Sequence, residues 1–221
     1  PLMLLVILEH ENGQLVEAAR EALTFGRVLA EKMGEDLEAA IIGSDNDDLV
    51  EAAGQFGAET VHTVTHDLLT DYGPDACGSV IAQMVESLDP DAVFSCGSDR
   101  GNEFMANAAA RLDAPFVANC TDVNPGDTWE MTRVQWGGSL LEDATLRADL
   151  PLLTCGLHAV AAEIGDEVPV LFDSGVRSGA DVARAISLGA DFVFAGRPLY
   201  FGLGALGADG AGHAYKILHD G

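Results

Sequence analysis

Short apolar runs alternate with segments of helical periodicity along most of the chain. The opening run LMLLVIL has the length of a buried strand, and the residues after it repeat apolar side chains at helical spacing as far as Met33, just before Gly34. The same two patterns recur, which places the predicted strands and helices of the first half at residues 2–9, 14–33, 37–42, 47–56, 59–64, 74–88, 92–96, 102–112 and 115–118. A β-α repeat with short connections predicts a parallel sheet covered by helices on both faces.

The periodicity changes after residue 128. Residues 129–137 and 141–148 alternate in polarity on either side of a Gly-Gly-Ser turn, which predicts an antiparallel hairpin, and Asp122 ahead of it is expected in a turn. A strand at 150–155 then returns to the sheet. Two further β-α units are predicted, with strands at 168–172 and 191–195 and helices at 179–188 and 208–219. The predicted fold class is therefore α/β, with a hairpin and two barrel-like β-α units after the main sheet.

The charge of the chain is strongly negative. Asp and Glu number 36 against 11 Lys and Arg in 221 residues, which gives a formal net charge of −25. This charge repels phosphate backbones and anionic lipid, so neither nucleic acid nor a membrane is an expected partner. Salt shortens the range of this self-repulsion to a Debye length of about 3 Å at 1 M. The large negative charge therefore favours a halophilic origin. No apolar run is long enough to span a bilayer, and we expect a cytoplasmic protein.

The cysteines and histidines form no metal-binding pattern. Cys77, Cys96, Cys120 and Cys155 lie far apart without a CxxC spacing, and the six histidines form no HExxH. We expect buried thiols and no metal site. Asp99 and Arg100 follow a predicted strand, where they could serve as a helix cap and a solvated charge or could contact a ligand or partner.

Residues 1 to about 157 resemble the amino-terminal domain of the electron transfer flavoprotein alpha subunit. The resemblance rests on LLVILEHENGQL, on CGSDRGNEFMANAAARLDAPFVANCTDV and on the ADLPLLTCG that ends the hairpin. It implies a domain that acts mainly as a scaffold, with a beta-subunit-like electron transfer flavoprotein and a flavin dehydrogenase as partners in a hetero-oligomer. In that family FAD is held chiefly by the next domain, whose serine- and glycine-rich motif this chain lacks, so FAD would require a complex with a partner subunit.

Residues from about 158 to 221 resemble the carboxyl end of the FMN-dependent 2-hydroxyacid dehydrogenases and oxidases. The stretch VPVLFDSGVRSGADVARAISLGADFVFAGRPLYFGLGALGADG carries this likeness. It implies that the FMN ribityl chain and phosphate are held by Asp173, Gly175, Arg177, Gly196 and Arg197. Glycines let backbone N–H groups approach a phosphate, and arginine supplies planar bidentate donors. The alternative is that both arginines only cap helix ends at the surface.

The same family uses a histidine and an arginine from a motif of the type SNHGxRQ, and that motif is absent from this sequence. Without a base to abstract a proton, no catalytic residue can be named. We therefore expect two domains, 1–157 and 158–221, in a flavoprotein component of electron transfer coupled to a flavin-dependent dehydrogenase. The alternatives are an FMN-dependent 2-hydroxyacid dehydrogenase or a part of one, and a non-catalytic assembly subunit with an empty flavin site.

Overall fold

The computed structural model describes residues 3–69, 71–135, 140–157, 171–173, 178–187, 190–194, 199, 203–204 and 208–220. The chain forms two compact units, Pro1–Val160 and Ala161–Gly221. The predicted domain boundary near residue 157 stays a prediction. Among the described residues, none of the helices combines the length and apolar composition needed to cross a membrane.

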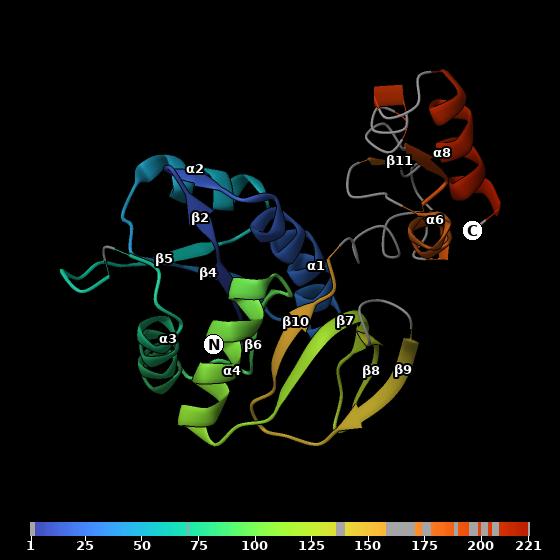
Figure 1. Ribbon diagram of the computed structural model, residues 1–221. Coiled ribbons are helices and arrows are strands. Elements are labelled where there is room, and N and C mark those ends of the chain that lie inside the picture. The colour runs from blue at the N-terminus through green and yellow to red at the C-terminus, as the bar shows by residue number, and fades with distance from the viewer. Residues whose placement is uncertain are drawn as a thin grey trace. The chain divides into compact units, whose positions relative to one another are not determined.

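An eight-stranded sheet in the order β5-β4-β1-β6-β10-β7-β8-β9 is the framework of the first unit (Figure 1). Its strands are β1 (Met3–Leu8), β4 (Asp36–Ile42), β5 (Thr60–Val64), β6 (Ala92–Cys96), β7 (Phe116–Asn124), β8 (Trp129–Gln135), β9 (Leu140–Leu146) and β10 (Leu152–Cys155). The strands from β5 to β7 in this order are parallel, whereas β8 and β9 run antiparallel. The predicted parallel sheet with an antiparallel hairpin is confirmed.

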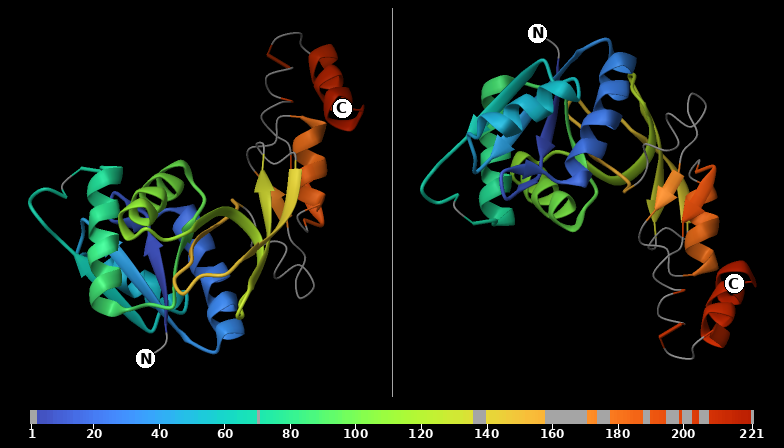
Figure 2. Two further views of the ribbon diagram at one scale, coloured as in Figure 1. Left: turned by 90° about the horizontal axis from the view of Figure 1, so that it is seen from below. Right: turned by 90° about the horizontal axis from the view of Figure 1, so that it is seen from above.

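Helices cover both faces of the parallel strands (Figure 2). The helices of this unit are α1 (Glu17–Met33), α2 (Asp47–Gln55), α3 (Pro74–Leu88) and α4 (Asp99–Leu112). In β1, Leu4 and Val6 belong to the core formed with α1 and α2, while Leu5 and Ile7 belong to the core formed with α3 and α4. Every residue of β1 is at most 3% exposed, because a central parallel strand is covered on both sides.

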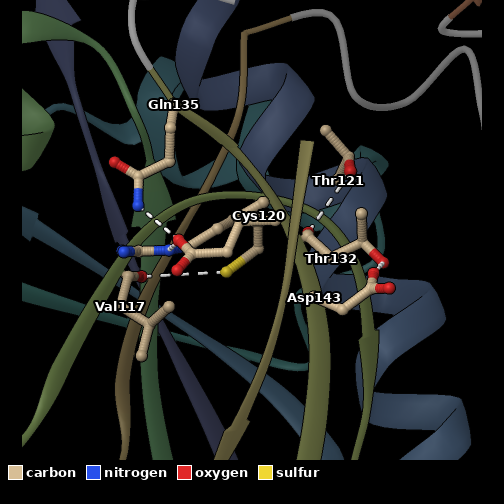
Figure 3. Close-up of polar contacts among 8 residues, drawn as sticks. Val117, Cys120, Thr121, Thr132, Gln135 and Asp143 are labelled. Atoms are coloured by element: carbon tan, nitrogen blue, oxygen red, sulfur yellow. Dashed lines mark hydrogen bonds and ion pairs between the residues drawn. The ribbon is translucent and has the colours of Figure 1, made fainter. Parts of the chain in front are cut away.

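Side-chain pairs fix the register of the β8–β9 hairpin (Figure 3). Arg133 Nε donates to Glu142 Oε2 at 2.8 Å, and the Thr132 hydroxyl donates to Asp143 Oδ1 at 2.9 Å. Each pair joins residues directly opposite each other, where cross-strand contacts stabilise a sheet most effectively. The hairpin therefore has a defined register.

Two predictions for single residues of the first unit are wrong. Asp122 lies within β7, opposite Thr132, rather than in a turn, because β7 continues past residue 118 to pair with β8. Its carboxylate also accepts a hydrogen bond from Lys32 Nζ at 3.1 Å. The cap of α4 is Ser98, not Asp99, since the Ser98 hydroxyl accepts from the Gly101 N–H at 2.8 Å.

The predicted first helix also begins too early. β2 (His10–Glu11) and β3 (Gln14–Leu15) form a short antiparallel hairpin ahead of α1. Its turn is Asn12-Gly13, and both residues have positive φ angles, 51° and 75°. Asn-Gly is the preferred sequence for this turn, so the signal was present in the sequence.

The second unit contains the two predicted β-α units. β11 (Leu171–Asp173) and β12 (Phe192–Phe194) pair in parallel, and α6 (Gly179–Ser187) and α8 (Ala208–Asp220) follow them along the chain. Ser178 and Asp181 cap α6 reciprocally: the Ser178 N–H donates to Asp181 Oδ2 at 2.9 Å, and the Asp181 N–H donates to Ser178 Oγ at 3.4 Å.

Candidate functional site

The residues expected to hold FMN follow two paired strands. Asp173 is the last residue of β11 and pairs with Phe194, the last residue of β12. The segments that follow both strands therefore begin at the same end of a small parallel sheet, the end where ligands usually bind. The remaining expected ligands, Gly175, Arg177, Gly196 and Arg197, lie outside the described residues.

The first unit contains a pocket at the equivalent end of its own sheet. The chain runs outward from β1 through β4 to β5 and then returns to the other side of β1 as β6. In open α/β sheets, ligands bind outside the carboxyl ends of the strands where the order reverses in this way. A cavity of about 420 Å³ lies there, which we call the switch-point pocket. It is lined by Ile7, Leu8, Glu9, His10, Glu11, Asn12, Ile42, Gly43, Leu69, Asp71, Tyr72, Cys77, Arg100 and Phe104.

Glu9 connects β1 to the start of α4 at this pocket. The Ser98 hydroxyl donates to the Glu9 carboxylate and accepts from the Gly101 N–H, so one serine links the two elements. Burial raises the pKa of Glu9, and the Ser98 hydrogen bond and the Arg100 charge oppose that rise. A half-buried carboxyl group therefore occupies the amino end of α4, where an anion could otherwise bind.

Arg100 and Tyr72 form one wall of the switch-point pocket. The guanidinium carbon lies 4.8 Å from the centre of the Tyr72 ring, a cation–π contact. The Tyr72 hydroxyl donates to Glu103 Oε2 at 3.0 Å and lies 3.3 Å from the Arg100 carbonyl oxygen. Burial and then this hydrogen bond to Glu103 raise the pKa of Tyr72, so the phenol stays protonated. Arg100 thus lines a pocket and is exposed, and whether it contacts a ligand or partner stays a prediction.

Thr154, Asn102 and Asn119 form a closed set of three hydrogen bonds at this end of the sheet. The Thr154 hydroxyl donates to Asn102 Oδ1 at 2.8 Å, the Asn102 amide donates to Asn119 Oδ1 at 3.1 Å, and the Asn119 N–H donates to Thr154 Oγ1 at 3.0 Å. Asn119 adopts a φ of 61°, a left-handed conformation that asparagine tolerates. These contacts join α4, β7 and β10, and we assign them a structural role.

Three thiols lie side by side at the same end of the sheet. Cys155 in β10 pairs in register with Cys96 in β6 and with Cys120 in β7, and all three are at most 1% exposed. A hydrogen bond to Cys96, together with burial, holds the pKa of Cys155 well above its usual value, and burial raises that of Cys120 to about 12. Cys120 and Cys155 therefore stay neutral, which makes them poor nucleophiles. In the described part of the chain, no group of histidine, cysteine and acidic side chains is arranged to hold a metal ion.

Most of the switch-point pocket was not predicted from the sequence. Arg100 was named as a candidate ligand contact, but Glu9 and Tyr72 of the lining were not, nor was Ser98, which donates to Glu9. The available signal was position, because Glu9 directly follows β1 and Ser98 follows β6 after a single glycine. Residues immediately after the strands of an open α/β sheet are candidates for a binding site.

A comparison with protein families identifies the fold. Residues 4–187 match the electron transfer flavoprotein domain. The chain belongs to the electron transfer flavoprotein domain family. This match extends beyond the first unit into the second.

Curated relatives fall into two groups. Protein FixB of Azorhizobium caulinodans is 30% identical over 141 residues, 62% of this chain and 38% of the relative. The electron transfer flavoprotein subunit alpha of Thermoanaerobacterium thermosaccharolyticum is 28% identical over 138 residues, 62% of this chain and 42% of the relative. An FMN-dependent alpha-hydroxy acid dehydrogenase of Schizosaccharomyces pombe is 48% identical over only 62 residues, 28% of this chain and 15% of the relative. The chain thus spans about two fifths of each of the first two relatives, and both predicted resemblances are confirmed.

Proposed function

We propose that this protein is a flavoprotein component of electron transfer that works with a flavin-dependent dehydrogenase. The observation that carries the proposal is the match of residues 4–187 to the electron transfer flavoprotein domain. It is supported by likeness to an alpha subunit of that class and by a sheet and hairpin that follow the expected order of elements. The cytoplasm of a halophile is the proposed setting, because 36 acidic residues outnumber the 11 basic ones.

The proposed cofactor of the second unit is FMN, held by Asp173, Gly175, Arg177, Gly196 and Arg197. Two observations support this site. The 62-residue likeness is to a dehydrogenase whose name states that it depends on FMN. In addition, Asp173 and Phe194 end neighbouring parallel strands in register, which suits a phosphate cradle built from two consecutive turns. Of the five proposed ligands the structure describes only Asp173, at the end of β11. A flavin held there would supply the transfer of one or two electrons.

The proposed partner is a beta-subunit-like electron transfer flavoprotein, and a complex with it could hold FAD. Exposed apolar side chains support association. Leu140 and Leu141 are adjacent on β9, so they point to its opposite faces, and they are 51% and 56% exposed. Phe192 and Phe194 are two positions apart on β12, so they share one face, and they are 61% and 53% exposed. A pair of exposed aromatic side chains on one face of a strand favours contact with a partner. The proposed complex is therefore a hetero-oligomer.

A second candidate function rests on the 48% identity to the FMN-dependent dehydrogenase. In this alternative the chain is part of a 2-hydroxyacid dehydrogenase whose base lies on another segment or chain. The third alternative is an assembly subunit, which would bind no flavin.

The visible absorption spectrum of the purified native complex distinguishes these functions. A bound flavin, released by denaturation and identified as FMN or FAD by chromatography, is expected under the first two proposals, and its absence supports the third. Lactate or glycolate is then added without oxygen. Bleaching of the flavin by the hydroxyacid alone supports the dehydrogenase, whereas bleaching that requires an added flavin dehydrogenase and its substrate supports the electron-transfer component.

A further inference from the structure

No role in the proposed electron transfer is assigned to the switch-point pocket, yet it has the features of a ligand site. Its volume of about 420 Å³ lies within the range of small-molecule sites. Buried Phe104 and half-buried Leu69 and Ile42 supply apolar walls. Such a cavity, with a few polar groups directed into it, is the usual form of a binding site for an organic molecule.

Three carboxylates are among the polar groups that line the pocket. Glu9 lies half-buried in its wall, and Glu11 and Asp71 are exposed lining residues. His10 adds no free donor at Nε2, because this nitrogen lies 2.9 Å from the Ile42 carbonyl oxygen and must donate to it. The lining thus contains three carboxylates and one guanidinium, that of Arg100, which stacks on the Tyr72 ring.

An anionic ligand is disfavoured at this position. The Glu9 carboxylate already accepts from Ser98, the cap of α4, which is the group an incoming anion would use. An anion would also bring a further negative charge beside Glu9, whose own ionised form burial already destabilises. A cation has the opposite effect, because it pairs with a carboxylate that is partly removed from water.

We propose that the switch-point pocket binds a small organic cation, an amine or amidinium on a flat apolar body. The charged end pairs with Glu9 and Asp71, and the flat body packs against Phe104 and Leu69. An amidinium suits a carboxylate because its two parallel N–H groups match the two carboxylate oxygens. This site does not rest on the proposed electron-transfer function.

Three molecules of one shape and different charge test the proposal. Benzamidine, benzamide and benzoate carry charges of +1, 0 and −1 on nearly the same skeleton. Each is titrated into the full-length protein by calorimetry. We expect saturable binding of benzamidine, at least about tenfold weaker binding of benzamide, and no binding of benzoate, because a charge-assisted hydrogen bond supplies most of the difference.

Substitutions of the lining carboxylates test whether benzamidine binds in the switch-point pocket. Glu9→Gln and Asp71→Asn should each weaken benzamidine binding by about tenfold or more. Asp113→Asn is the matched control, because it removes one negative charge at the far end of α4 and asparagine accepts the left-handed φ of 51° found there. Asp71 is exposed, so its variant keeps the test valid if Glu9→Gln does not fold. Benzoate binding as tight as benzamidine, no saturable benzamidine binding, or equal losses in Asp71→Asn and Asp113→Asn would overturn the proposal.

Discussion

Replacing Gly101 by alanine tests the close approach of α4 to the end of β6. A Cβ atom at this position would lie 1.9 Å from the Cys96 carbonyl oxygen and 3.1 Å from Ser98 Oγ. The helix must therefore withdraw from the strand, and the cap bond from the Gly101 N–H to Ser98, now 2.8 Å long, is weakened or lost. Loss of a cap costs about 1 kcal/mol and overpacking about 1–3 kcal/mol, so we expect a destabilisation of about 2–4 kcal/mol.

Thermal unfolding followed by circular dichroism measures this effect. For a protein of this size, 1 kcal/mol corresponds to about 2–4 °C in Tm, so Gly101→Ala should lower Tm by about 4–16 °C. Gly54→Ala is the control, because Gly54 lies in α2 with nothing within 4 Å of the added Cβ. It should stabilise the protein by about 0.5–1 kcal/mol. A Gly101→Ala variant as stable as the wild type would refute the close packing of α4 on β6.

Three further predictions concern salt, pH and association. Because the net charge is −25, Tm measured by circular dichroism should rise between low and molar chloride, with most of the rise from residues 1–157, and a flat or falling Tm would rule out halophilic adaptation. Burial raises the pKa of Glu9 above 4.5. The stability contributed by protonated Glu9 in the folded protein is therefore fully present below pH 4.5 and is lost as the pH rises through the folded-state pKa. Glu9→Gln, which resembles the protonated form, should therefore gain stability over the wild type from pH 4 to pH 8, and a difference in Tm that does not change with pH would contradict this. Light scattering should show the chain bound to a co-expressed beta-like subunit, with Leu141→Asp weakening the complex, whereas a monomer without affinity for that subunit would count against the proposed partner.

Local signals in the sequence were sufficient for most of the fold. Helix α3 spans Pro74–Leu88, as predicted, because proline favours the first turn and the apolar spacing continues to Leu88. Strand β6 likewise matches its predicted bounds, 92–96. One error arose where tertiary pairing extends an element: β7 continues to Asn124 because β8 pairs with it.

Which residues meet at the carboxyl end of the main sheet could not be predicted from their spacing in the sequence. Cys96 and Cys155 are 59 positions apart in the sequence, yet they lie side by side because β10 inserts between β6 and β7. Glu9 and Ser98 are separated by 89 positions and meet because β6 returns to β1. The order of strands decides both groupings, and no local pattern encodes it. The five flavin ligands came from a resemblance, and their role stays a prediction.

Titration calorimetry with FMN and riboflavin tests the central claim most directly. If Gly175, Arg177, Gly196 and Arg197 hold a phosphate, the native complex freed of its flavin should prefer FMN, because only FMN carries the charged group. Arg197→Ala should weaken FMN binding by about tenfold to a hundredfold, the effect of one charge-assisted hydrogen bond, and leave the weaker riboflavin binding nearly unchanged. Asp173→Ala should weaken both ligands through the ribityl chain. Equal losses for FMN and riboflavin in Arg197→Ala, or no FMN binding by the intact complex, would contradict the account.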